Sequence, residues 1–166
     1  MATITLKGTE FHTNGDLPAV GSVALDFVLT RQTLADVSLD DFAGKRKIIS
    51  IVPSLDTPIC QLSTKKFNER AEQLSNTVVL VVSADLPFAM SRFCGAEKLS
   101  NVVPLSMMRG RNFAKDYGVF IEDGPFKGIT ARALLVLDEN NVVISAQLVT
   151  EIADEPDYDS ALATLS

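Results

Sequence analysis

Continuous apolar runs and stretches of helical spacing divide the chain into alternating strands and helices. Residues 47–52 and 77–83 are rich in Ile and Val and predict two strands that are buried on both faces. Between them, residues 58–75 predict a helix, with Pro58 at its first position and Thr57 as its N-cap. The apolar side chains expected on the buried face of this helix are Ile59, Leu62, Phe67, Ala71 and Leu74.

Weaker patterns supply the remaining elements. Alternation over residues 3–13 predicts an N-terminal hairpin, and residues 131–138 and 142–148 predict a second hairpin. A βαβ unit followed by a hairpin and a last helix is typical of thioredoxin. We therefore predict an α/β, thioredoxin-like fold with a central sheet flanked by helices, in a single domain over 1–166 with the N-terminal hairpin at about 1–14. Shorter elements are expected as strands at 27–29 and 102–105 and as helical segments at 38–42, 91–99, 112–117 and 158–165.

Charge and composition narrow the classes of function. The formal net charge of −6 argues against nucleic acid as a partner, since binding to phosphates needs a basic surface. No stretch is long and apolar enough to span a membrane, and the N-terminus lacks the features of a secretory signal, so we expect a cytoplasmic protein. Two cysteines and one histidine match no zinc spacing and cannot build a four-ligand structural zinc site without carboxylates.

Cys60 is the first candidate for chemistry. It lies in the first turn of the predicted helix, just after a buried strand. Backbone N–H groups and the helix dipole favour an anion at this position, and a thiolate is both an anion and the nucleophilic form of cysteine. Composition alone favours inert buried thiols, so further residues must support a reactive role.

The residues just before Cys60 allow two interpretations each. The Thr57 hydroxyl could hydrogen-bond the thiolate or an oxygen substrate, or it could only cap the helix, which contributes about 1 kcal/mol. Pro53 could form an apolar wall of the site or simply end the strand. We expect Asp56 to face away from the sulfur, because a nearby carboxylate disfavours a thiolate.

Three residues far from this run complete the candidates. Arg132 begins an apolar strand, where a guanidinium needs a partner anion or an exposed end. It could stabilise the thiolate and the charge that develops as a peroxide O–O bond breaks, or it could be solvated. Cys94 falls in the next helical region and could approach Cys60 or remain a buried small side chain. His12 could pair with Cys60 as in cysteine proteases, but this is the weakest alternative. No Cys-x-x-Cys spacing is present, which argues against an ordinary thioredoxin-type reductase.

Three blocks of sequence resemble the thiol peroxidase group of peroxiredoxins, of the atypical two-cysteine type. The first block is Pro-x-x-x-Thr-x-x-Cys at Pro53, Thr57 and Cys60. The resemblance extends over almost the whole chain. The other two blocks are Ser83–Ala89 with Arg92–Glu97, and Asp123–Pro125 with Ala131–Ala133.

The resemblance implies a set of roles and partners. Cys60 would be the peroxidatic cysteine, and Cys94 would resolve its sulfenic acid to an intramolecular disulfide. Thr57 and Arg132 would bind the peroxide, and Pro53 would shield the site. Thioredoxin would be the reductant, hydrogen peroxide and organic (alkyl) hydroperoxides the substrates, and a homodimer the usual assembly. The resemblance implies no cofactor, whether metal, flavin or haem. A redox sensor that uses the same two cysteines and a structural module with inert thiols remain the alternatives.

Overall fold

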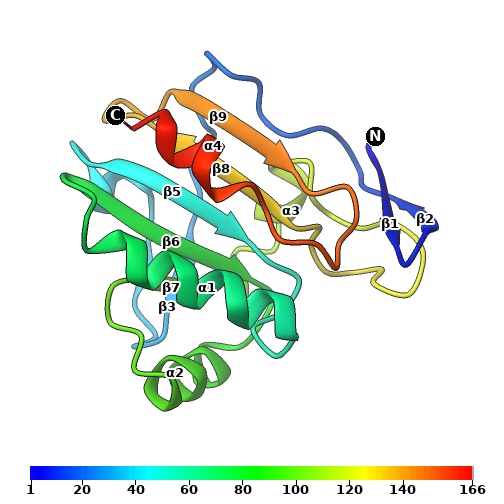
Figure 1. The fold of residues 1–166 in the computed structure, drawn as a ribbon, viewed down its shortest axis with the longest axis horizontal. Helices are drawn as coiled ribbons and strands as arrows, with labels where there is room; N and C mark the ends of the chain where they lie inside the picture. The colour runs from blue at the N-terminus through cyan, green and yellow to red at the C-terminus, as the bar shows by residue number, and fades with distance from the viewer. Residues whose placement is uncertain (166) are drawn as a thin grey trace.

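Within residues 1–165, which the computed structural model describes, the chain forms a seven-stranded mixed sheet and a separate two-stranded hairpin (Figure 1). Ser166, the last residue of the expected domain, lies outside the described residues. The order of the large sheet is β4-β3-β7-β6-β5-β8-β9. The strands are β1 (Thr3–Leu6), β2 (Thr9–His12), β3 (Leu29–Arg31), β4 (Asp36–Val37), β5 (Arg46–Ile51), β6 (Thr77–Ser83), β7 (Val103–Ser106), β8 (Ala133–Leu137) and β9 (Val143–Leu148). The helices are the 3₁₀ helix η1 (Leu39–Phe42) and the α-helices α1 (Pro58–Ala71), α2 (Pro87–Ala96), α3 (Phe113–Asp116) and α4 (Tyr158–Ala163).

The centre of the sheet brings the candidate residues to one edge. β5, β6 and β7 run parallel, whereas β8 runs antiparallel to β5. Ile51, at the end of β5, pairs with Val82 on one side and with Ala133 on the other. The ends of β5 and β6 therefore lie beside the start of β8. α1 follows β5 from this edge, so its N-terminus lies there too.

Both faces of the sheet are apolar, as expected for strands buried on two sides. One face packs against α1, α2 and α4, and its cluster contains both cysteines together with alternate residues of β5, β6 and β8. The opposite face packs against the N-terminal segments and α3. α1 and α4 lie in front of the sheet in Figure 1, and α3 lies behind it. The expected sheet with flanking helices and an N-terminal hairpin is confirmed.

Several element boundaries differ from the prediction. The strand expected at 27–29 is β3, two residues later, because Phe27 instead packs its ring on Phe113 in the core. The helix expected at 58–75 ends at Ala71, where the next turns close with tighter hydrogen bonds from Gln73 to Arg70 and from Leu74 to Ala71. α2 begins at Pro87, earlier than the expected 91.

The buried face of α1 also differs from the one expected. Leu62 is 39% exposed, whereas Ser63 and Thr64 are buried with Cys60 and Phe67. The hydroxyls of Ser63 and Thr64 donate to the Cys60 carbonyl, at 3.2 and 2.8 Å. These bonds satisfy the two polar groups locally, so they can enter an apolar interface.

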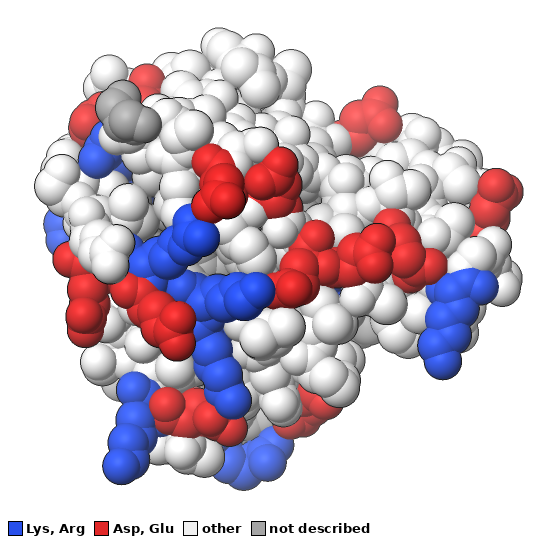
Figure 2. All heavy atoms as spheres, in the orientation of Figure 1, with Lys and Arg blue, Asp and Glu red and all other residues white. Residues whose placement is uncertain are grey.

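Charged side chains of both signs share the outer surface of the helical face. Figure 2 shows Lys and Arg gathered over α1 with Asp and Glu beside them. Three ion pairs account for part of this pattern: Lys65–Glu97, Lys66–Glu155 and Arg70–Asp159. Among the described residues, no helix is both long and apolar enough to cross a membrane.

Candidate functional site

Cys60 is the third residue of α1 and is completely buried. The N–H groups in the first turn of a helix lack partners within the helix, so the sulfur is close to a group of backbone donors. It belongs to an apolar cluster that also contains Leu55, Phe67 and Leu134. Burial removes water from the sulfur, while the helix end supplies the polar stabilisation that a thiolate requires.

Thr57 occupies the N-cap position, as predicted, but its side chain does not cap the helix. Its backbone is extended, with φ −99° and ψ 147°. Its hydroxyl donates to the Ser54 carbonyl at 3.0 Å, where Thr57 N–H also donates at 3.2 Å. Because its proton is engaged in this bond, the Thr57 oxygen is available to accept a hydrogen bond from another group.

Segments from both sides hold the loop before Cys60. The Asp85 carboxylate accepts hydrogen bonds from the Ser54 hydroxyl and from Leu55 N–H, both at 2.7 Å. On the other side, the buried Thr130 hydroxyl donates to the Val52 carbonyl at 3.0 Å. Pro53 lies between these two anchors and is buried. The loop therefore has a defined shape, with Pro53 facing into the protein.

Asp56 behaves as expected for a side chain turned away from the sulfur. It is exposed, and its carboxylate lies 3.1 Å from the Arg92 guanidinium. Arg92 belongs to α2, so this ion pair joins the loop before Cys60 to the helix that carries Cys94. A second ion pair, between Lys65 and Glu97 at 2.9 Å, joins α1 to the end of α2.

Arg132 lies on the same face of the sheet as Cys60. It immediately precedes Ala133, which pairs with Ile51 at the end of β5. Side chains two apart in a strand share a face, and Leu134 and Val136 both belong to the apolar cluster that contains Cys60. Arg132 continues this row toward the edge where α1 begins. Because it is only 3% exposed, the alternative of a solvated arginine does not hold.

The guanidinium of Arg132 is only partly satisfied. Its Nε donates to the Ile152 carbonyl at 3.0 Å. Its Nη1 is buried and has no hydrogen-bond partner among residues 1–165, the only such side-chain atom in that range. An unpaired buried donor is costly, so its retention on the face of the sheet that holds Cys60 indicates a functional use.

The Glu155 carboxylate, in the segment before α4, is attracted by the positive charge of Arg132. The hydrogen bond from Lys66, at 2.8 Å, is the main cause that holds the pKa of Glu155 below its usual range. A bond from Tyr158 and the attraction of Arg132 act in the same direction, while partial desolvation opposes them. Arg132, Glu155 and Lys66 thus link the strand β8, the segment before α4 and the helix α1.

Acid should loosen this link. A carboxyl whose pKa is lower in the folded than in the unfolded state stabilises the fold above its ordinary value of 4.5, and this stability is lost as the pH falls below it. The lowered pKa values of Glu151 and Asp157 act with the same sign. We expect the unfolding free energy to fall between about pH 5 and pH 3, and to fall less steeply in Glu155→Gln. Denaturant titrations at each pH would measure both slopes, and equal slopes would contradict a contribution from Glu155.

Cys94 lies in α2, is 5% exposed and belongs to the same apolar cluster as Cys60. Both thiols are free in this structure. Burial raises the pKa of the Cys94 thiol, which keeps it protonated and weakly nucleophilic near neutral pH. Cys94 thus lies on the next helix, as expected. Its buried, protonated thiol is poorly suited to nucleophilic attack on another sulfur.

His12 is engaged elsewhere. Its Nδ1 lies 2.8 Å from an Asp123 carboxylate oxygen, and its backbone N–H donates to the other oxygen of the same group. This pairing ties the N-terminal hairpin to the segment between α3 and β8, and it leaves no support for a Cys–His pair. Within residues 1–165, no group of three or more His, Cys, Asp or Glu side chains could hold a metal ion.

Three residues of the site escaped the sequence reasoning. Asp85 and Thr130 hold the Cys60 loop, and Glu155 interacts electrostatically with Arg132. Asp85 lies two residues after the buried strand 77–83 and within the block Ser83–Ala89, but neither signal assigns it to the Cys60 loop. Thr130 and Glu155 lie in irregular segments, where no pattern marks a single polar residue.

Comparisons with known proteins agree with this geometry. A model of the Redoxin family matches residues 19–162. The thiol peroxidase of Corynebacterium glutamicum is 48% identical over the full length of both chains. A peroxiredoxin-like protein from Aquifex aeolicus superposes with a TM-score of 0.93 at 39% identity, covering 99% of this chain and 96% of its own. A thiol peroxidase from Chromobacterium violaceum superposes with a TM-score of 0.92 at 26% identity, covering 98% and 94%.

These likenesses extend over the cysteine site and the sheet that positions it. The family model includes Pro53, Cys60, Cys94 and Arg132, and the relative from Corynebacterium glutamicum aligns from end to end. The chain therefore belongs to the Redoxin family, in the thiol peroxidase group of peroxiredoxins, and it is a thiol-dependent peroxidase.

Proposed function

We propose that the chain reduces hydrogen peroxide and organic hydroperoxides at Cys60 and is recycled through a Cys60–Cys94 disulfide. The observation that carries the proposal is the buried, unpartnered Nη1 of Arg132, on the face of the sheet that holds Cys60. A fixed N–H donor with a positive charge suits an oxygen atom that becomes negative during the reaction. The Thr57 oxygen, with its proton on Ser54, would accept from the peroxide O–H.

The first step transfers one oxygen to sulfur. The Cys60 thiolate attacks the terminal oxygen of R–O–O–H, an S–O bond forms, and the O–O bond breaks. Its electron pair leaves on R–O⁻, which takes up a proton to give an alcohol, or water when the substrate is hydrogen peroxide. Arg132 would stabilise the negative charge on the departing oxygen, and Pro53 would keep water from the sulfur.

The second step joins the two cysteines. The Cys94 sulfur attacks the sulfenic sulfur of Cys60, an S–S bond forms, and the hydroxyl leaves as water with the proton from Cys94. Because burial raises the pKa of the Cys94 thiol, this step requires α2 to expose or reposition it. The ion pairs Asp56–Arg92 and Lys65–Glu97 would have to separate or adjust during that movement.

Thioredoxin would then return the enzyme to its dithiol form, its own dithiol being oxidised in exchange. We also propose that the whole chain acts as one domain, which the Redoxin match over residues 19–162 supports, and that it assembles as a homodimer in the cytoplasm. The identity of 48% to a thiol peroxidase supports the peroxide substrate and the thiol reductant.

The test is a peroxidase assay coupled through thioredoxin and its reductase to NADPH oxidation, with cumene hydroperoxide and hydrogen peroxide as substrates. The intact chain should consume many equivalents of peroxide. Cys94→Ser should consume about one equivalent and then stop, because the sulfenic acid has no internal partner. Dimedone should label Cys60 in this variant after a single addition of peroxide.

Two outcomes would count against the proposal. Full turnover by Cys94→Ser would remove Cys94 from the cycle. Oxidation of the intact chain once, with no reduction by thioredoxin, would favour the redox-sensor alternative. Thermal melting of Cys94→Ser serves as the control for folding, since the serine enters an apolar cluster.

A further inference from the structure

The Asp85 carboxylate joins the two segments that carry the cysteines. Asp85 lies between the end of β6 and the start of α2, the helix that contains Cys94. Its Oδ1 accepts a hydrogen bond from the Ser54 hydroxyl and its Oδ2 accepts one from Leu55 N–H, both at 2.7 Å. Both donors belong to the loop before Cys60. One side chain at the start of α2 therefore holds the loop that leads to the other cysteine.

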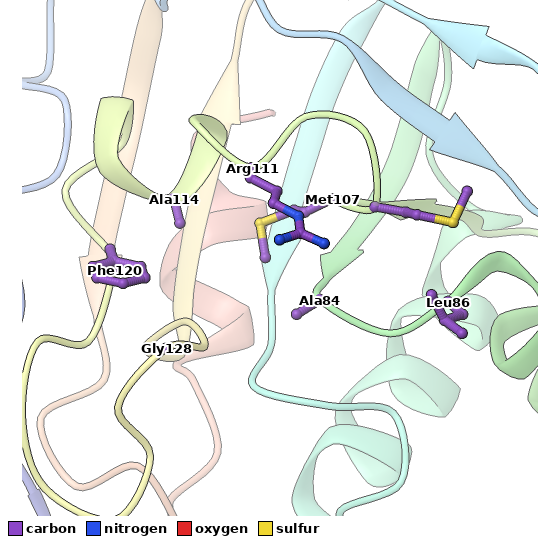
Figure 3. A pocket seen from close by; sticks show the side chains of 8 residues that line it. Ala84, Leu86, Met107, Arg111, Ala114, Phe120 and Gly128 are labelled. Carbon is purple, nitrogen blue, oxygen red and sulfur yellow. The ribbon is translucent and has the colours of Figure 1, made fainter.

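Hydrogen bonds also fix the position of Asp85 itself. Its N–H donates to Ser83 Oγ at 3.2 Å, and the Ser83 hydroxyl donates back to Oδ2 at 2.7 Å. Its carbonyl accepts from the Ser106 hydroxyl, at the end of the neighbouring strand β7. Ala84 and Leu86, the neighbours of Asp85 in the sequence, are exposed and line the pocket drawn in Figure 3. Because neither neighbour is buried, these bonds rather than apolar packing keep Asp85 at the edge of the sheet.

The proposed disulfide step requires α2 to move relative to the loop before Cys60. Cys60 is completely buried, and burial raises the pKa of the Cys94 thiol. Such a movement stretches the two bonds from the loop to Asp85. The ion pair of Asp56 with Arg92 links the same two segments, but both of its side chains are well exposed, so its contribution is small. The bonds to Asp85 are charge-assisted and only partly exposed, so they are the stronger link.

We propose that Asp85 is a positioning residue that favours the first step of the reaction and opposes the second. While its carboxylate holds the loop, Thr57 and Cys60 keep the arrangement that meets the peroxide. When these bonds open, the loop and α2 separate, Cys94 reaches the sulfenic sulfur of Cys60, and water leaves as the S–S bond forms. This inference rests on the proposed function, and the chemistry stays at the two sulfurs.

The two steps can be timed in one experiment. One equivalent of hydrogen peroxide is added to the reduced chain, samples are quenched in acid at short intervals, and free thiols are alkylated and counted by mass spectrometry. The reduced chain carries two alkylated cysteines, the sulfenic acid carries one, and the disulfide carries none. Only the first step depends on the concentration of peroxide, so repeating the series at several concentrations separates the two rate constants.

Asp85→Ala removes both bonds to the loop, so disulfide formation should become about 10-fold faster, the effect of losing one hydrogen bond to a charged group. The first oxidation should not become faster, because the loop spends less time in its reactive shape. Asp85→Asn keeps one acceptor oxygen and should give a smaller change in the same direction. It also carries the test if thermal melting shows that Asp85→Ala does not fold.

Thr130→Val is the matched control. It removes the other anchor of the loop, the bond to the Val52 carbonyl, but this bond joins the loop to the segment before β8 and not to α2. Disulfide formation should therefore not accelerate in Thr130→Val. An unchanged rate of disulfide formation in the Asp85 variants, or an equal acceleration in Thr130→Val, would overturn the role of Asp85. A disulfide in the intact chain would show that only this inference had failed. If the intact chain formed none, the proposed function would fail together with it.

Discussion

Cys60→Ser is expected to lower the peroxidase activity by at least about 1000-fold, to the level of the uncatalysed reaction. A serine hydroxyl is not ionised near neutral pH and cannot form a sulfenic acid, so neither the attack nor the oxygen transfer can occur. The measurement is the thioredoxin-coupled rate, together with the mass of the chain after exposure to excess peroxide. The intact chain should gain oxygen or a disulfide, and the variant should gain neither.

This experiment needs a control for a loss of folding around the changed side chain. Cys60 is completely buried in an apolar cluster, so a serine hydroxyl there costs stability if it finds no partner. Cys60→Ala removes the hydroxyl and should be equally inactive, with thermal unfolding close to that of the intact chain. Retained turnover in either variant would move the chemistry to another group and end the assignment of Cys60.

The sequence was sufficient to predict the strands at the centre of the sheet. β5, β6 and β8 are continuous runs of Ile, Val and Leu, and such runs have few stable arrangements other than a strand buried on both faces. By contrast, β4 was not predicted, because its two residues carry no periodicity. It exists only through antiparallel pairing with β3, where Leu29 lies opposite Val37.

The start of the helix that carries Cys60 was predicted correctly, but its end and its buried face were not. Pro58 and Thr57 marked its first residue correctly, because the backbone constraints at a helix start are local. Its buried face depended on tertiary contacts. Hydropathy favoured Leu62 over Ser63, yet the hydrogen bond from Ser63 to the Cys60 carbonyl makes Ser63 the better side chain to bury.

The candidate site also contains residues that the sequence could identify and contacts that only the structure could reveal. Cys60 could be identified from its position after a strand, and Arg132 from the anomaly of a charge beginning an apolar strand. Neither pattern could reveal that Arg132 Nη1 lacks a partner, since that depends on Ile152 and Glu155 in a segment of irregular structure. The role of Thr57 also required the structure, because only the structure shows its hydroxyl bonded to Ser54.

Arg132→Met is expected to slow the oxidation of Cys60 by about 100-fold, the usual loss when one donor to a developing negative charge is removed. Methionine fills a similar volume without leaving a buried cation, and it removes both the free Nη1 donor and the positive charge. Arg132→Lys keeps the positive charge but loses the planar arrangement of N–H donors in the guanidinium. Its oxidation rate should therefore lie between those of the intact chain and Arg132→Met.

The chain contains no tryptophan, so rapid quenching followed by alkylation and mass spectrometry is the suitable measurement of the first step. Arg46→Met is the matched control, because Arg46 also donates to backbone carbonyls, at Leu165 and Ser75, but it lies at the opposite end of β5.

The comparison of these variants separates structural from catalytic loss. Arg132→Met leaves the Ile152 carbonyl without its partner, which should cost about 1–3 kcal/mol of stability, and Arg46→Met should cost a similar amount. If the role of Arg132 were purely structural, Arg132→Met would lower the melting temperature as Arg46→Met does. The oxidation rate of the folded chains would then be unchanged in both variants. A slow first oxidation in Arg132→Met alone would instead assign to this guanidinium the charge that the leaving oxygen needs, since no other buried side-chain donor within residues 1–165 is left unpaired.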